Sequence, residues 1–223
     1  NTEMGVRQER VGARMQSILA EQEALREQPD WVEPVFKLEF DVMPKTKRMV
    51  SALNPSDGLS VKDGALKIHS YGNTHAFLKI PLAVTASGFV IKLRQETDAG
   101  QSWGPGAMLQ WPNGIGIRVG ARSDGTLQSD VFGKQTHGGK HVHDNWVWVR
   151  VRWLERQGVV ERSLDGQNWK RLWTFDWMFE HRGVASGKTA SLLVGKVPFN
   201  GEAVDHSEPG LEGHCEIDFV RVY

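Results

Sequence analysis

The chain has 223 residues, of which 39% are hydrophobic, and this is enough for one large core. Lysine and arginine total 27, aspartate and glutamate also total 27, and the formal net charge is therefore zero. Such a chain has no overall field that attracts nucleic acid, and it contains no apolar run of the length that a transmembrane helix requires. We therefore expect a globular protein with no nucleic-acid partner and no membrane insertion.

The first segment, residues 3–27, is predicted to be one amphipathic helix. Apolar residues recur there every three to four positions between Glu, Gln and Arg, namely Val11, Met15, Ile18, Leu19 and Leu25. Gln28 precedes Pro29, and a residue before proline is biased away from helix. Residues 1–30 are therefore expected to form a helix and linker that packs on its own domain or on a segment upstream of it, with dimerisation or another protein partner as the alternative.

Residues 31–223 are expected to form a second unit, in which the apolar period changes to two. This period is typical of half-buried antiparallel strands. Residue pairs that tolerate the positive φ of tight hairpins separate the strands: Asp63-Gly64, Asn113-Gly114, Asp124-Gly125 and Asp165-Gly166. About a dozen short strands without a second helical block predict an all-β fold, a two-sheet antiparallel jelly-roll sandwich.

The strand at residues 146–153 also predicts which side chains face the core. Val147, Val149, Val151 and Trp153 alternate with a second set, Trp146, Trp148, Arg150 and Arg152. Because successive side chains of a strand point to opposite faces, the first set is predicted to be buried and the second to face outward.

Three stretches resemble the concanavalin-A-like lectin/glucanase jelly-roll superfamily. The stretch WVRVRWLERQGVVERSLDGQNWKRL has its order of strand, turn, strand and Ser-x-Asp-Gly-x-x-Trp, while LSVKDGALKI and EIDFVRVY resemble an early strand pair and the last strand. The resemblance covers about residues 35–223 and implies the fold more specifically than an activity. Ser163, Asp165 and Trp169 are also similar to the Asp-box hairpin of sialidases, but one residue is missing, and we interpret this hairpin as scaffold.

The resemblance implies glucanase chemistry as one hypothesis. Retaining glycosidases of this fold carry Glu-x-Asp-x-Glu or Glu-x-Asp-x-x-Glu on one strand, because their two carboxyl groups must lie about 5 to 5.5 Å apart. The closest match here is Glu216-Ile217-Asp218, which is followed at the third carboxylate's positions by Val220 and Arg221. Neither side chain can donate a proton to a leaving oxygen, so hydrolysis by this strand is not expected.

Polysaccharide lyases also have this fold, and they imply a second enzyme hypothesis. A lyase needs a Tyr or His that takes a proton and a cation that neutralises the uronate. His69 and Tyr71 fall on one strand face, His75 follows the turn, and Arg94 is a candidate neutraliser. The alternative is that His69 and Tyr71 are ordinary strand residues.

The segment KQTHGGKHVHDNW is the densest group of candidate metal ligands. His141 and His143 would share a face, and His137 could fold back to give three imidazoles for a zinc-like ion, with Asp144 nearby. The alternative is a solvated histidine loop.

A second metal hypothesis comes from the resemblance. Jelly rolls of this superfamily often hold a structural calcium ion where the first and last strands meet, and the matching oxygen ligands here are Glu39, Asp41, Glu216 and Asp218. Paired charges on a sheet face explain the same residues without an ion. No cofactor other than this calcium is expected.

The tryptophan content suggests a glycan site, because the chain has nine Trp but only two Tyr. Indole rings stack on the apolar faces of sugars, and arginine binds their hydroxyl or acidic groups. The expected site consists of Arg94, Trp103, Trp111, Arg118, Arg122 and Trp146. The alternative is that these Trp side chains are buried between a sheet and its covering loops.

The sequence therefore leads to one main functional hypothesis and two alternatives. The main hypothesis is a non-catalytic glycan-recognising domain, free-standing or a module of a larger carbohydrate-active protein that is secreted or periplasmic. Its partner would be a polysaccharide or oligosaccharide, and an acidic one rather than a neutral one. The alternatives are a polysaccharide hydrolase or lyase, and a structural module that assembles with another protein through its Trp-rich face and N-terminal helix.

Overall fold

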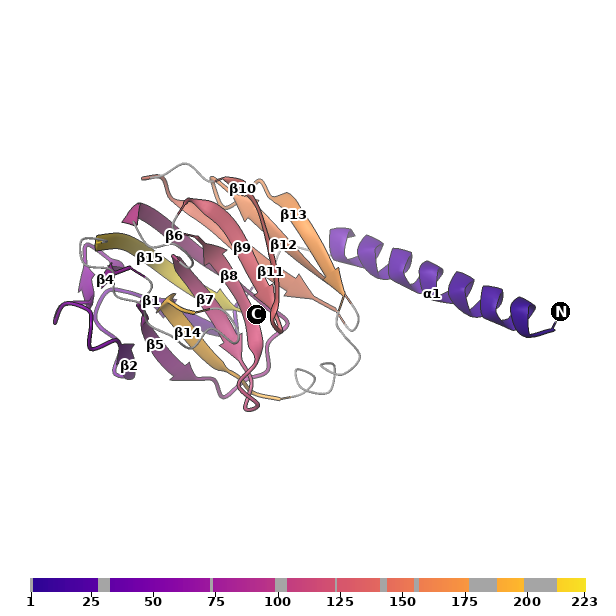
Figure 1. Cartoon of the computed structure of the whole chain (residues 1–223), viewed down its shortest axis with the longest axis horizontal. Helices are drawn as coiled ribbons and strands as arrows, with labels where there is room; N and C mark the ends of the chain where they lie inside the picture. The colour runs from indigo at the N-terminus through magenta and orange to yellow at the C-terminus, as the bar shows by residue number, and fades with distance from the viewer. Residues whose placement is uncertain are drawn as a thin grey trace.

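The computed structural model describes residues 2–27, 33–72, 74–98, 104–122, 124–140, 144–154, 157–176, 188–198 and 212–223. One helix, α1 (Thr2–Glu27), is followed by two antiparallel sheets that pack face to face (Figure 1). This arrangement confirms the predicted all-β sandwich with an N-terminal helix.

Sheet A has eight strands in the described part of the chain. Seven follow the order β13-β12-β11-β6-β15-β4-β3, and β1 pairs with β15 outside this path. Their bounds are β1 (Phe36–Glu39), β3 (Leu59–Lys62), β4 (Ala65–Tyr71), β6 (Gly88–Asp98), β11 (Val147–Trp153), β12 (Gln157–Ser163), β13 (Lys170–Asp176) and β15 (Glu212–Val222).

Sheet B has seven strands over the same described ranges, in the order β10-β9-β8-β7-β14-β5-β2. Their bounds are β2 (Lys47–Val50), β5 (Ala76–Pro81), β7 (Pro105–Gln110), β8 (Gly116–Ala121), β9 (Thr126–Val131), β10 (Lys134–Lys140) and β14 (Ser191–Lys196). Strands distant in sequence become neighbours here, because β14 lies between β5 and β7.

The core fills the space between the two sheets. Strand β11 presents the faces that its alternation predicts, since Val149 and Val151 are fully buried and Trp153 is 8% exposed. The corresponding inward residues of sheet B include Leu192 and Val194, which are also fully buried. Each sheet therefore has one apolar face directed into the core, and the side chains that could meet a ligand lie mainly on its outward face.

Strand β15 is central to sheet A, because it pairs with β4 on one side and β6 on the other. Cys215 is a buried free thiol on this strand, and Ile217 lies in the core beside it. A β-bulge falls between Ile217 and Phe219, which changes the register against β6. The last strand is thus an interior element of the sheet.

Helix α1 occupies the predicted residues but does not pack as expected. Val6, Val11, Met15 and Leu19 are between 49% and 62% exposed, and the helix projects beyond β12 and β13, away from the sandwich (Figure 1). Ile18, in contrast, is half-buried and α1 contacts β12, so the expected packing of the apolar face on its own domain is seen only in part. None of the described helical residues forms a segment long and apolar enough to cross a membrane.

The hairpin that joins β12 to β13 is held by its own hydrogen bonds. The Asp165 carboxylate accepts bonds from the Asn168 N–H at 2.7 Å, the Gln167 N–H at 2.9 Å and the Ser163 hydroxyl at 2.8 Å. Gly166 has a φ of 75°, as the predicted turn requires. Asp165 thus binds its own turn, which agrees with its interpretation as scaffold.

The Asp165 turn predicts a specific dependence of stability on pH. The Asn168 N–H lowers the pKa of the carboxyl most, followed by the Asn168 side chain, the Gln167 N–H and the Ser163 hydroxyl. A carboxyl whose folded pKa is depressed stabilises the fold above its unfolded pKa, about 3.9, and loses this contribution as the pH falls toward the folded value. We expect the difference in Tm between wild type and Asp165→Ala to shrink on acidification from about pH 5 to about pH 2. A difference that stays constant would contradict this role of the carboxylate.

Candidate functional site

Two of the six expected glycan-binding residues meet on the outward face of sheet A. The Arg94 guanidinium lies 4.9 Å from the centroid of the Trp146 ring, and its Nε donates a hydrogen bond to Glu216 Oε2 at 2.7 Å. Both side chains are half-buried. They are adjacent because Arg94 pairs with Glu216 across β6 and β15, while Trp146 directly precedes β11 on the other side of β6.

The other expected residues do not converge with these two. Arg118 is fully buried on β8, where it donates to the carbonyls of Val197 at 2.8 Å and Gly104 at 2.9 Å. Trp111 is 3% exposed and packs edge-on against Trp153 in the core. The expectation of one groove lined by all six is therefore wrong for those described.

The end of β8 packs closely against β7. Gly120 lies within β8, and a Cβ at this position would come within 2.3 Å of the Pro105 carbonyl oxygen. The neighbouring strand β7 therefore leaves no space for a ligand beside Gly120. Arg122 is half-buried just after β8, and Trp103 lies outside the described residues.

Glu216 is the centre of an ion-pair group on the outward face of sheet A. It is 3% exposed and contacts Lys67 from β4 and Arg94 from β6. The next outward carboxylate, Asp218, lies 2.5 Å from Lys92 Nζ. Both of these outward carboxylates are therefore in contact with cations of the neighbouring strands.

Cations also cover the indole rings on this face. Lys92 Nζ lies 4.7 Å from the centroid of the Trp148 ring, and the Arg150 guanidinium lies 4.0 Å from that of Trp169. Arg150 Nε in turn donates to Glu161 Oε2 at 2.6 Å. Each of these cations lies over an indole ring on which a sugar could otherwise stack. The tryptophans therefore pack against the protein's own side chains.

The residues of the lyase hypothesis are only partly brought together. His69 and Tyr71 share the outward face of β4, with ring centroids 5.7 Å apart. Strand β15 separates them from Arg94, whose guanidinium is bound to Glu216. The cation that the lyase reaction would need is thus already engaged by a buried carboxylate.

Three of the four proposed calcium ligands pair with a cation instead. Glu39 pairs with Arg221 at 3.2 Å, and Glu216 and Asp218 pair as described above. Asp41 is exposed just beyond β1. Paired charges on a sheet face, the alternative to a calcium site, thus account for three of the four residues.

Of the three histidines of the histidine-loop hypothesis, His137 is exposed on β10, while His141 and His143 lie outside the described residues. Among the described residues, one group of three or more side chains brings potential metal-binding atoms within 4.8 Å of one another. It consists of His69, Glu212 and His214, and none of the histidine-loop residues belongs to it.

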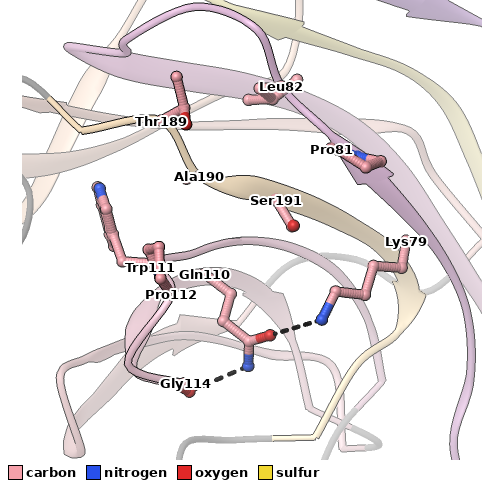
Figure 2. A pocket seen from close by; sticks show the side chains of 10 residues that line it. All are labelled: Lys79, Pro81, Leu82, Gln110, Trp111, Pro112, Gly114, Thr189, Ala190 and Ser191. Atoms are coloured by element: carbon pink, nitrogen blue, oxygen red, sulfur yellow. Dashed lines mark hydrogen bonds between the residues drawn. The ribbon is translucent and has the colours of Figure 1, made fainter.

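A pocket of about 310 Å³ opens at one end of sheet B, where β5, β14 and β7 lie side by side. Its walls come from ten residues, Lys79, Pro81, Leu82, Gln110, Trp111, Pro112, Gly114, Thr189, Ala190 and Ser191. Figure 2 shows Trp111 and Pro112 on one side of this space and Lys79 on the other, with the Ser191 hydroxyl directed between them. An apolar wall thus faces a polar one.

The polar wall is held in place by a short chain of hydrogen bonds. Lys79 Nζ donates to Gln110 Oε1 at 3.3 Å, and Gln110 Nε2 donates to the Gly114 carbonyl at 3.0 Å (Figure 2). The turn after β7 fixes the other side, because the Trp111 N–H donates to the Ile115 carbonyl at 2.9 Å. Gly114 allows this turn with a φ of 86°.

The pocket begins where an apolar cluster on the outward face of sheet B ends. Phe77, Met108 and Leu193 are buried in that cluster. Leu193 and Met108 are paired, and the paired residues Ser191 and Gln110 lie two positions further along the same strands, on the same face. None of the ten described residues that line the pocket carries a carboxylate, an imidazole, a phenol or a thiol. Its described lining therefore has groups that bind a polar molecule but none of the carboxyl and imidazole groups that most often act as general acid and base.

Sequence reasoning identified Trp111 but missed the other residues of the pocket. Lys79 and Pro81 alternate on one face of β5, which the period of two indicates. The positions of Gln110 and Ser191 beside them depend on β14 lying between β5 and β7, and no local signal gives this order.

No family model matches the chain, and no curated protein matches it in sequence. Solved structures do match. The laminarinase from Flavobacterium sp. UMI-01 has a TM-score of 0.57 at 10% identity, with 86% of this chain and 100% of that chain covered. SCLam, a non-specific endo-β-1,3(4)-glucanase from family GH16, has a TM-score of 0.59 at 10% identity, with 85% and 90% covered. A sialidase has a TM-score of 0.52 at 13% identity, with 79% of this chain but 16% of that chain covered.

These matches cover most of this chain, at TM-scores of 0.57 and 0.59. The chain has the fold of the concanavalin-A-like lectin/glucanase superfamily. The predicted resemblance is confirmed at the level of fold, and at these identities the activity has to be argued from the chain's own residues.

The Glu216 group yields a prediction about stability. Glu216→Gln removes the charge between Lys67 and Arg94 in a site that is almost fully buried, and we expect a loss of about 2 to 4 kcal/mol in the free energy of unfolding. Glu39→Gln is the matched control, because its pair with Arg221 is exposed and should contribute less than about 1 kcal/mol. Denaturant unfolding of both variants measures this, and equal losses would contradict a special role for Glu216.

Proposed function

We propose that this chain recognises a glycan in the pocket at the end of sheet B and does not cleave it. The observation that carries this proposal is the pairing of an apolar wall with a fixed polar wall in a pocket of about 310 Å³. Binding sites for small polar molecules are typically concave and mostly apolar, with a few placed polar groups. The exposed Pro112 would contact the apolar face of a sugar ring, with the almost fully buried Trp111 supporting this wall from the core, while Lys79, Gln110 and Ser191 would bind its hydroxyl groups.

The absence of an acid and base from the ten described lining residues favours recognition over hydrolysis or lysis. The carboxylates Glu216 and Asp218 lie in sheet A and are paired with cations. A second function, a lyase built on His69 and Tyr71, is disfavoured because its candidate neutralising cation, Arg94, binds Glu216. These contacts support a binding domain and not an enzyme.

The charge of the pocket favours an acidic glycan. Lys79 is the one charged side chain among the ten described lining residues. Its ammonium group donates to Gln110 and keeps further donor capacity for a carboxylate or sulfate substituent. Hydrogen bonds to charged groups contribute about 1.5 to 3 kcal/mol, so one such contact would separate acidic from neutral glycans by more than tenfold.

The structural neighbours support a glycan as the class of ligand. They are a laminarinase, a glucanase and a sialidase, and in the sialidase the matched region is 16% of the chain. The same fold therefore occurs both alone and as one part of a longer protein. We infer that this chain acts outside the cytoplasm, secreted or periplasmic, where polysaccharides of this kind are found.

Isothermal titration calorimetry with alginate-like, pectin-like and neutral glucan oligosaccharides tests the proposal. We expect the wild type to bind an acidic oligosaccharide and Lys79→Ala to weaken this binding by about tenfold or more. Lys134→Ala is the matched control, because Lys134 is an exposed cation on β10, at the far edge of sheet B from β5.

Three outcomes would contradict the proposal. They are no heat with any glycan, an equal loss of affinity in both lysine variants, or shortening of the oligosaccharide during the titration. Oligomers that form with rising protein concentration, in the absence of glycan affinity, would favour assembly through α1 instead.

A further inference from the structure

Two histidines and a glutamate lie together on the outward face of sheet A, away from the pocket. Strand β4 carries His69, and β15 carries Glu212 and His214, which are two residues apart and so point to the same side. The register pairs His69 with His214 and Tyr71 with Glu212. Residues directly opposite or diagonal across neighbouring strands are within reach of long side chains, so the register alone brings these three together.

The ring nitrogens of both histidines are directed toward the same carboxylate oxygen. His69 Nε2 contacts Glu212 Oε1, and His214 Nε2 lies 3.4 Å from that atom. The two imidazole rings are stacked, with centroids 4.5 Å apart and planes inclined by 13°. Their potential metal-binding atoms all lie within 4.8 Å of one another.

A fourth side chain supports His69 from behind. Asp57 Oδ1, in the turn before β3, lies 3.5 Å from His69 Nδ1, the ring nitrogen that does not face Glu212. Histidines that bind metals nearly always donate their other ring N–H to a carboxylate or carbonyl, which fixes the tautomer and the orientation of the ring. The carboxylate, His69 and the shared centre thus follow the arrangement of a carboxylate–histidine–zinc triad.

We propose that His69 Nε2, His214 Nε2 and Glu212 Oε1 form a binding site for a divalent transition metal ion, zinc above all. Two imidazoles and one carboxylate suit zinc, whereas calcium and magnesium prefer oxygen ligands alone. Zinc is bound at about 2.0 to 2.2 Å by these atoms, so the three side chains need only small rotations to surround it.

The site would be open on one side. Its three protein ligands leave a fourth position, and Glu212 and His214 are 52% and 45% exposed, so this position faces solvent. Zinc sites with three protein ligands keep a water or an oxygen of a bound molecule in that position. The proposed site is independent of the pocket in sheet B and does not rest on glycan recognition there.

Zinc binding to the full chain tests this proposal directly. The protein is first freed of metal with a chelator, then titrated with zinc in competition with a chromogenic chelator, and separately with cobalt(II) as an absorbance probe of the ligand geometry. We expect one strongly bound zinc that is lost in both His214→Ala and Glu212→Gln. Asp57→Asn should retain the site but weaken it by about 10- to 100-fold, as removal of an outer carboxylate does.

His137→Ala is the matched control, because this histidine is exposed on β10 in the other sheet. All variants should keep the Tm of the wild type, because Glu212, His214 and His137 are at least partly exposed at the surface. Absence of strong zinc binding in the wild type, or zinc binding that survives both His214→Ala and Glu212→Gln, would overturn the proposal. So would a zinc site that is lost in His137→Ala, which would place the metal at the histidine loop instead.

Discussion

The carboxylate of Glu216 is the contact on which the arrangement of sheet A depends. It is almost fully buried on the central strand β15, and it contacts Lys67 from β4 and Arg94 from β6. A buried carboxylate is costly unless it is paired, so these contacts favour the register that sets Lys67 and Arg94 beside Glu216, in addition to the backbone hydrogen bonds of the three strands. The same register sets His214 opposite His69, and the proposed zinc site therefore depends on the pairing of β15 with β4.

The two outward faces of the sandwich have different chemistry. On sheet A, carboxylates are paired with cations, and cations cover the rings of Trp146, Trp148 and Trp169. On sheet B, a buried apolar cluster ends at a pocket with one apolar and one polar wall. A sugar needs both kinds of surface at once, and it is the end of sheet B that provides them together.

Local patterns in the sequence were sufficient for the strands and turns, but not for their neighbours in space. The alternation in β11 gave its buried and outward faces, and Asp165-Gly166 gave the hairpin. Arg118 shows what these patterns do not predict. It is one of the residues expected at the glycan site, but it donates to buried backbone carbonyls instead. Gly106 leaves room for its guanidinium, since a Cβ there would lie 3.0 Å from Arg118 Nη2. Such a contact depends on strand order, as do the pairing of His69 with His214 and the meeting of Lys79 with Gln110 and Ser191.

The central claim is that a glycan binds at the end of sheet B, and mapping amide chemical shifts by NMR tests it most directly. The labelled chain would be titrated with acidic oligosaccharides and, in parallel, with neutral ones. The account predicts that an acidic oligosaccharide shifts the amides of Lys79, Gln110 and Ser191 and their neighbours on β5, β7 and β14, and leaves the oligosaccharide intact. Shifts confined to β6, β11 and β15, or no shifts with any of the oligosaccharides, would contradict it.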